Sequence, residues 1–269
     1  NPDNDRFILS KGHASALLYA AWAELGKITE TELLTYRHYG SVLEGHPTRR
    51  CTYVQAATGS LGIGLSIGLG HALNARIDER TYYTYVLMGD GELAEGSIWE
   101  AAQLGSYYKL NNLIGIVDCN RLGQTGETMV GNHAQVYAQR FAAFGWHTFI
   151  IDGHNIQEIM TALETARTIK DKPIMIIANT IKGYGVDFAA DKNNYHGKAL
   201  DKEQALQELA ATFPIQEAYA GITAFKPQVP NSRPLTEKSN SGNTTLPAYT
   251  LGELIATRKA YGQALAALG

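Results

Sequence analysis

The chain has 269 residues, 45% of them hydrophobic, which is enough for one large α/β domain or for one domain with part of another. Its 23 Lys and Arg against 26 Asp and Glu give a formal net charge of −3, which excludes the strongly basic surface of a nucleic-acid-binding protein. Two cysteines, Cys51 and Cys119, exclude a disulfide framework and favour a reducing cytoplasm, and no apolar run reaches the length of a membrane span, so we expect no membrane partner.

The first part of the chain predicts two helices and a long loop. Residues 17–25 carry an apolar helical face. Residues 29–37 predict a second helix, with Thr29 as N-cap and Glu32 three residues later, as in a capping box. Residues 40–58 are rich in loop-forming residues.

A helical pattern over residues 59–75 contains four glycines, at Gly62, Gly64, Gly68 and Gly70. Each glycine inside a helix costs about 1 kcal/mol relative to alanine, so we expect close packing of this helix to compensate. Residues 59–64 also fit the spacing of a dinucleotide-binding loop, but no clear strand precedes them, which disfavours that interpretation.

From there on, apolar runs alternate with helical patterns. The predicted strands lie near 83–88, 113–118, 146–151 and 173–179, and the predicted helices near 97–109, 135–144, 156–169 and 203–212. The apolar runs lack the alternation of a strand with one solvated face. The sequence therefore predicts an α/β fold, a largely parallel sheet with helices on both faces.

The end of the chain changes in composition. Residues 226–250 are rich in Pro, Ser, Asn and Thr and predict an interdomain linker. This divides the chain into a domain over 1–225, the linker, and a helix over 251–269 that opens a further domain. Because the chain begins abruptly at Asn1 and stops after that helix, we expect it to be a fragment of a longer polypeptide.

Two predicted strands are each followed by an oxygen-bearing side chain that suits a hard cation. Asp90 follows the run ending at Met88, and Asn120 follows the run ending at Val117. In parallel sheets both positions lie at the carboxyl edge, where open α/β folds bind ligands. A carboxylate and an amide can hold a divalent ion while leaving sites for phosphate oxygens, and Gly91 lets a diphosphate approach the backbone.

Several further motifs accompany residues 89–126. They are Asp5-Arg6-Phe7, Ser10-Lys11-Gly12-His13-Ala14, Gly45-His46-Pro47, Thr58-Gly59-Ser60-Leu61-Gly62, His196-Gly197-Lys198 and Ile255-Ala256-Thr257-Arg258-Lys259-Ala260-Tyr261-Gly262. Together with residues 89–126, these motifs resemble transketolase, a thiamine diphosphate-dependent family. The resemblance covers nearly the whole chain and is closest to the vertebrate-like branch.

The resemblance implies a set of site residues. The metal, Mg²⁺ or Ca²⁺, would be held by Asp90, Asn120 and the backbone carbonyl of Leu122. Thiamine diphosphate would contact His13, Gly59, Ser60, Leu61, Gly91, Asn120, Lys182 and His196. The catalytic groups would be His13, His46, His196 and Glu95, with Glu95 meeting a glutamate of the partner subunit. Ile63 departs from the family, in which Gln is usual. Taken singly, Asp90 and Glu95 also suit helix N-termini.

The implied function is transfer of a two-carbon ketol unit from a ketose phosphate to an aldose phosphate, as in the pentose phosphate pathway. The resemblance also implies a homodimer and a pyrimidine-binding domain supplied by the rest of the polypeptide or by a second subunit. We therefore expect this chain alone to be inactive. The alternatives are a related enzyme, such as dihydroxyacetone synthase or deoxyxylulose phosphate synthase, and a non-catalytic cofactor-binding half.

Overall fold

The structure, a computed structural model, describes residues 2–213, 245, 247–250 and 252–268. Contacts divide the chain into two compact units, Asp3–Asn231 and Ser232–Gly269. The predicted boundary at residue 225 and most of the predicted linker lie outside the described residues, so this division stays a prediction. In the second unit, helix α8 spans Thr257–Leu268, within the stretch predicted to be helical.

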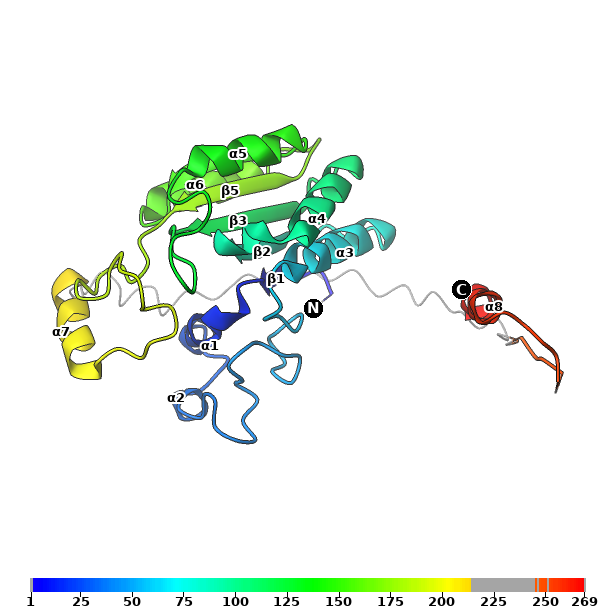
Figure 1. The fold of residues 1–269 in the computed structure, drawn as a ribbon, viewed down its shortest axis with the longest axis horizontal. Coiled ribbons are helices and arrows are strands. Elements are labelled where there is room, and N and C mark those ends of the chain that lie inside the picture. The colour runs from blue at the N-terminus through cyan, green and yellow to red at the C-terminus, as the bar shows by residue number, and fades with distance from the viewer. Residues whose placement is uncertain (1, 214–244, 246, 251, 269) are drawn as a thin grey trace. The chain divides into compact units, whose positions relative to one another are not determined.

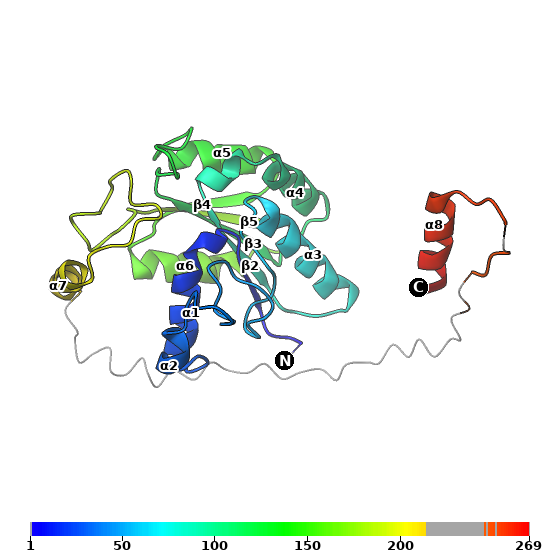
Figure 2. The same ribbon diagram turned by 60° about the horizontal axis from the view of Figure 1, so that its bottom comes forward.

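The first unit is built on a sheet of five parallel strands in the order β1-β2-β3-β5-β4 (Figure 1; β4 is labelled in Figure 2). The strands are β1 (Arg6–Leu9), β2 (Thr84–Gly89), β3 (Leu113–Cys119), β4 (His147–Asp152) and β5 (Ile174–Asn179). The four strands expected from the sequence are confirmed to within one residue or so at each end. The fold class, α/β with a parallel sheet, is confirmed as well.

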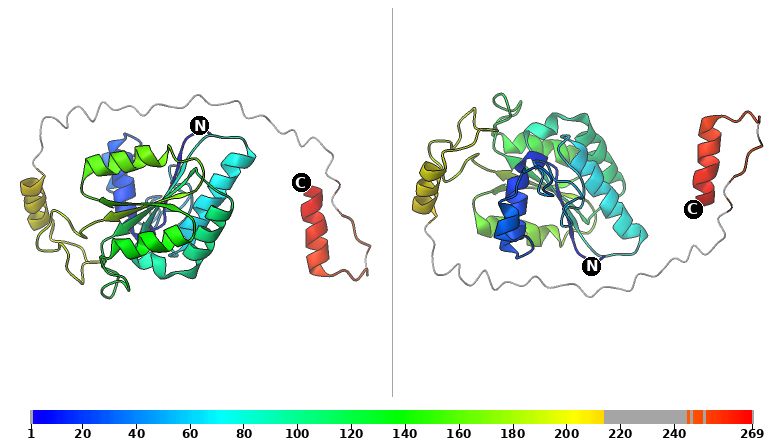
Figure 3. Two further views of the ribbon diagram at one scale, coloured as in Figure 1. Left: turned by 90° about the horizontal axis from the view of Figure 1, so that it is seen from above. Right: turned by 90° about the horizontal axis from the view of Figure 1, so that it is seen from below.

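Helices cover both faces of the sheet. One face carries α3 (Ile63–Ile77), α4 (Gly96–Tyr107) and α5 (Ala134–Ala143), and the other carries α6 (Ile156–Ala166). Figure 2 shows α4 and α5 above the sheet and α6 below it, and the two views of Figure 3 show α5 and α6 on opposite sides. The double cover explains why the strand sequences are continuous apolar runs.

Alternate residues of the central strands enter different cores, as the strand period of two requires. Val117 and Ile177 pack with α3, α4 and α5, whereas Ile114, Ile174 and Ile176 pack with α6. Among the helices in the described part of the chain, none is long and apolar enough to cross a membrane.

The segment before β2 differs most from the sequence expectation. Helix α1 spans Ser15–Glu24, close to the predicted range. The second helix, α2, is only Glu30–Leu33, so the predicted range 29–37 is wrong in length, although the capping box of Thr29 and Glu32 is confirmed. Arg37 ends the helical path with a φ of 62°, and its N–H donates to Leu43 O at 2.9 Å.

Strand β1 was not predicted from the sequence, because its four residues are too few to show a period that distinguishes strand from loop. It pairs with β2 from Arg6↔Thr84 to Leu9↔Leu87. Its place at the sheet edge matters for the site, because the chain leaves β1 directly into Ser10, Lys11 and His13. The last predicted helix of this unit, 203–212, is α7 (Lys202–Thr212), with Asp201 as its N-cap.

Three of the four glycines noted in this helical pattern lie where a Cβ would clash with a neighbouring atom. A Cβ on Gly64 would lie 2.1 Å from Ser10 Oγ, and one on Gly68 would lie 2.3 Å from Val86 Cγ2. Gly62 is the N-cap, with a left-handed φ of 88°. Gly70 is the exception, because nothing lies within 4 Å of its Cβ position.

We therefore expect Gly68→Ala and Gly70→Ala to change stability in opposite directions. Gly68→Ala forces a methyl group into Val86 and should lower the free energy of unfolding by about 1–3 kcal/mol. Gly70→Ala meets open space and should raise it by about 0.5–1 kcal/mol through helix propensity. Urea unfolding monitored by circular dichroism measures both, and equal effects of the two variants would contradict the packing explanation.

Candidate active site at the carboxyl edge of the sheet

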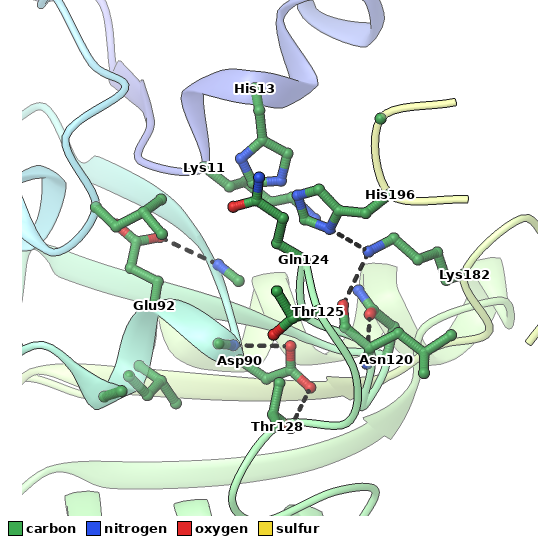
Figure 4. A pocket seen from close by; sticks show the side chains of 18 of the residues that line it. Lys11, His13, Asp90, Glu92, Asn120, Gln124, Thr125, Thr128, Lys182 and His196 are labelled. Carbon is green, nitrogen blue, oxygen red and sulfur yellow. Dashed lines mark hydrogen bonds between the residues drawn. The ribbon is translucent and has the colours of Figure 1, made fainter. Parts of the chain in front are cut away.

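Because all five strands run parallel, the segments that follow them leave from one edge of the sheet. Four of these segments border a single cavity of about 660 Å³ (Figure 4). The turn after β1 contributes Lys11 and His13, and the turn after β2 contributes Asp90 and Gly91. The loop after β3 contributes Asn120 and Leu122 to Val130, and the segment after β5 contributes Lys182, His196 and Gly197. His46, Gly59 and Leu61 enter from the loop between α2 and α3.

Asp90 is buried at this edge, with 4% of its surface exposed. Its Oδ1 accepts from Gly91 N at 2.9 Å, and its Oδ2 accepts from Arg121 N at 2.6 Å and from Thr128 Oγ1 at 3.3 Å. Burial raises the pKa of this carboxyl, while the two backbone N–H groups act in the opposite direction. A buried carboxylate facing a cavity is costly unless a positive charge compensates it.

Asn120 and Leu122 complete a set of oxygen atoms beside Asp90. Asn120 is 6% exposed, and its Oδ1 accepts from Leu122 N at 3.2 Å. The described residues hold no group of three or more His, Cys, Asp or Glu side chains that could bind a metal by themselves. One carboxylate, one amide and one carbonyl suit Mg²⁺ that shares its shell with phosphate oxygens, so the residues present fit a metal–diphosphate site.

Lys182 connects the oxygen-bearing loop to a histidine cluster. Its Nζ donates to Leu122 O at 2.8 Å and lies 2.8 Å from His196 Nδ1. A lysine ammonium only donates, so His196 Nδ1 accepts and Nε2 carries the ring proton. The rings of His13 and His196 lie 4.9 Å apart between centroids. The structure thus brings together two of the three predicted catalytic histidines from opposite ends of the unit.

The third predicted histidine, His46, lies against Gly59. A Cβ on Gly59 would lie 2.9 Å from His46 Cδ2, and Gly59 has a φ of 136°, so only glycine fits both the space and the backbone. His46, Gly59 and Leu61 line the cavity.

Two predicted residues lie outside the lining of this cavity, Ser60 and Glu95. Glu95 is the N-cap of α4, is exposed, and makes no side-chain capping bond. Its role toward a partner subunit therefore stays a prediction.

Glu92, which is 2% exposed, was not predicted from the sequence as a site residue. Its Oε1 accepts from Gly62 N at 2.8 Å and from the Ser10 hydroxyl, and its Oε2 accepts from Gly89 N at 3.2 Å. Burial raises the pKa of Glu92, and these hydrogen bonds oppose the rise. A polar residue two positions after Asp90 was its only sequence signal.

Lys11 and Gln124 are further residues of the cavity. Lys11 forms an ion pair with Asp118, which Thr180 also contacts. Burial favours a higher pKa for Asp118, but Lys11 and Thr180 outweigh it and lower that pKa. Gln124 projects from the loop after β3 toward His13 and His196 (Figure 4).

Partial burial, followed by the nearby positive charge of Lys11, lowers the pKa of His13 from 6.5 to about 4. The folded chain thus keeps His13 neutral at a pH where the unfolded chain takes up a proton. The unfolded chain therefore binds a proton at His13 that the folded chain does not, and the free energy of unfolding decreases as the pH falls from 6.5 toward about 4.

We expect an NMR titration of the imidazole signals to show His13 neutral at pH 6. The variant Lys11→Met should raise the pKa of His13, because it removes a nearby cation and leaves Asp118 unpaired. Lys27→Met, at an exposed position, is the control. A His13 signal that titrates near 6.5 in the unmodified chain would contradict the electrostatic account.

Comparison with known proteins agrees with this geometry. A model of the family described as "Transketolase, thiamine diphosphate binding domain" matches residues 1–219. Human transketolase is 46% identical over 270 residues, covering 100% of this chain and 42% of the human protein. One subunit of the apulose-4-phosphate transketolase of Phocaeicola vulgatus is 39% identical over 209 residues, covering 77% of this chain and 74% of that protein.

Solved structures of transketolases are also similar to this chain. A transketolase of Pichia stipitis in complex with sedoheptulose 7-phosphate matches with a TM-score of 0.72 and 32% identity, covering 82% of this chain and 35% of that one. Transketolase from Leishmania mexicana matches with a TM-score of 0.71 and 28% identity, covering 100% of this chain and 47% of that one. This chain spans less than half the length of the human protein. It belongs to the transketolase family, and most of its length is the thiamine diphosphate binding domain of that family.

Proposed function

We propose that this chain provides the diphosphate- and metal-binding half of a transketolase. The enzyme would transfer a two-carbon ketol unit from a ketose phosphate to an aldose phosphate, as in the pentose phosphate pathway. The observation that carries the proposal is the convergence of Asp90, Asn120, Lys182 and His196 on one cavity from three parallel strands. Bound thiamine diphosphate would supply the carbanion chemistry of the reaction.

The residues of this chain would bind, orient and move protons. Asp90, Asn120 and the Leu122 carbonyl would hold Mg²⁺ or Ca²⁺ and thereby the diphosphate. Gly91 and the Gly59–Leu61 segment would allow the cofactor close to the backbone. His13, His46 and His196 would donate hydrogen bonds to substrate hydroxyls and oxygen. The neutral state of His13 favours donation from N–H over charge stabilisation.

The partners and location are part of the same proposal. We infer a homodimer in the cytoplasm, with sugar phosphates as substrates and Glu95 at the contact between subunits. The chain spans 42% of the human relative, so a pyrimidine-binding domain would come from the same polypeptide or from a second subunit. Intact mass of the native protein distinguishes these two arrangements. We expect the 269 residues alone to give no turnover.

His196→Ala tests the proposal, because it should lower turnover without unfolding the chain. His196 lies in a loop and contacts Lys182. Its loss therefore removes a donor to the substrate and leaves the hydrophobic cores on the two faces of the sheet intact. We expect kcat to fall by about 100-fold or more in the native enzyme. The measurement is coupled detection of glyceraldehyde 3-phosphate, with His38→Ala as an exposed control outside the cavity. Unchanged kcat together with a much lower melting temperature would favour a purely structural His196.

A further inference from the structure

Two loops of the cavity are joined by an arginine that no catalytic assignment uses. One loop follows β3 and carries Asn120 and Leu122, and the other follows β5 and carries His196. Arg121 belongs to the first loop. Its Nε donates to Asp191 Oδ1 at 2.9 Å and its Nη2 donates to Asp191 O at 3.1 Å. Its Nη1 forms an ion pair with Glu127. The guanidinium thus contacts both loops.

Asp191 continues the connection toward the histidine cluster. Its backbone N donates to Lys182 O at 2.9 Å. The side chain of Lys182 then returns to the first loop through Leu122 O and also contacts His196 Nδ1, each at 2.8 Å. The chain of contacts therefore runs from Arg121 through Asp191 and Lys182 back to Leu122, the residue next to Arg121. Two contacts therefore join the two loops, one between Arg121 and Asp191 and one between Lys182 and Leu122.

The backbone at both ends of the arginine contact is in an uncommon conformation. Arg121 has a φ of 62° and Asp191 a φ of 55°, which residues other than glycine seldom adopt. Such conformations persist where surrounding contacts over-determine them. At Arg121 the conformation also directs the backbone N–H to Asp90 Oδ2 at 2.6 Å. One residue therefore contacts the carboxylate of the proposed metal site and the loop that carries His196.

An ordinary surface ion pair does not account for this arrangement. The Arg121 side chain is 23% exposed, but its partners Glu127 and Asp191 are 60% and 51% exposed, so burial does not set these ion pairs apart. An exposed pair contributes little, because water screens it and the side chains lose freedom. Arg121 instead donates from all three guanidinium nitrogens to two separate segments. The acceptors are the side chains of Asp191 and Glu127 and the backbone carbonyl of Asp191.

We propose that Arg121 is a positioning residue that couples the loop carrying Asn120 and Leu122 to the loop carrying His196, so that cofactor affinity and histidine placement depend on each other. The inference rests on the proposed function for its ligand. Arg121 touches no reacting atom in this role, and it acts through Asp191 and the Lys182 backbone.

The first arm of the test uses the native protein without cofactor. Amide hydrogen exchange is compared in unmodified protein, Arg121→Met, Asp191→Asn and the control Arg50→Met. We expect Arg121→Met to speed exchange at the Asp191 amide and across residues 183–197 by about tenfold, with α4 unchanged. Arg50→Met should leave both loops as they are. Exchange at Asp191 that stays at the unmodified rate in Arg121→Met would overturn the proposal.

The second arm measures thiamine diphosphate binding with Mg²⁺ by calorimetry. We expect Arg121→Met to weaken binding by about tenfold and Arg50→Met to change it by less than about twofold. In the double variant Arg121→Met with Asp191→Asn, the loss should be close to that of Arg121→Met alone, because residues in one network are not additive. Additive losses, or binding by Arg121→Met as tight as that of Arg50→Met, would overturn the positioning role.

The two arms also separate this inference from the proposed function. If the unmodified native protein does not bind thiamine diphosphate, the proposed function fails, and the exchange measurement still decides whether Arg121 couples the loops. If binding occurs and the variants behave alike, the proposed function stands and the coupling is wrong. Melting temperatures of Arg121→Met and Arg50→Met should agree closely, which excludes general destabilisation as the cause of weaker binding.

Discussion

Replacing Asp90 with Ala is expected to abolish metal-dependent binding of thiamine diphosphate while the fold survives. Asp90 supplies the one carboxylate of the oxygen set formed with Asn120 and the Leu122 carbonyl. Without it, the negative diphosphate would enter a partly buried cavity with less cation to neutralise it. Loss of partners outside the first coordination sphere already costs metal sites about 10–100-fold in affinity, so loss of this ligand should cost about 100-fold or more.

The fold should survive the loss of stability that accompanies this change. Asp90→Ala leaves Gly91 N and Arg121 N without their acceptor, a loss of about 1–3 kcal/mol. Calorimetry with thiamine diphosphate and Mg²⁺ measures the affinity, and circular dichroism checks the fold. Asp152→Ala is the matched control, because Asp152 also ends a strand, β4, but is exposed and does not line the cavity. Affinity equal to that of the unmodified chain would contradict the assignment of Asp90.

Replacing Glu92 with Ala is expected to produce a large loss of stability. This one carboxylate accepts from Gly62 N at the start of α3, from Gly89 N at the end of β2 and from the Ser10 hydroxyl after β1. Ala would leave these three donors, two of them buried, without this acceptor and would open a space between three segments. We expect the free energy of unfolding to fall by about 3 kcal/mol or more.

Glu92→Gln should cost less than Glu92→Ala, because its amide oxygen can still accept from Gly62 N and Ser10 while its NH₂ faces Gly89 N. Glu24→Ala, at an exposed position near the end of α1, is the control. Urea unfolding gives the three values. A midpoint for Glu92→Ala equal to that of Glu24→Ala would show that the hydrogen bonds of Glu92 do not stabilise the fold.

The covered sheet was predictable from the sequence because double burial produces continuous apolar runs. Strands β2, β3 and β5 have such runs, and each lies between helices. Strand β1 was not predictable, since four residues carry too short a pattern, and its pairing with β2 is a long-range contact. The length of α2 was overestimated because its capping box marks where a helix begins and says nothing about where it ends.

The positions of Asp90 and Asn120 followed from local sequence, because each directly follows an apolar strand in a parallel fold. The contacts that join distant segments did not. His13 follows β1 and His196 follows β5. The two rings lie close together because both strands end at the same edge of the sheet. The partners of Glu92 and the contact of Arg121 with Asp191 likewise depend on tertiary placement that no local pattern encodes.

The most direct test of the central claim is a crystal structure of this chain with thiamine diphosphate and Mn²⁺, in which anomalous scattering locates the metal. The account predicts one Mn²⁺ at the carboxyl edge of β2 and β3, bound by an Asp90 carboxylate oxygen, Asn120 Oδ1 and Leu122 O, together with oxygens of the diphosphate. A metal bound elsewhere, or a diphosphate seated away from Asp90 and Asn120, would contradict it.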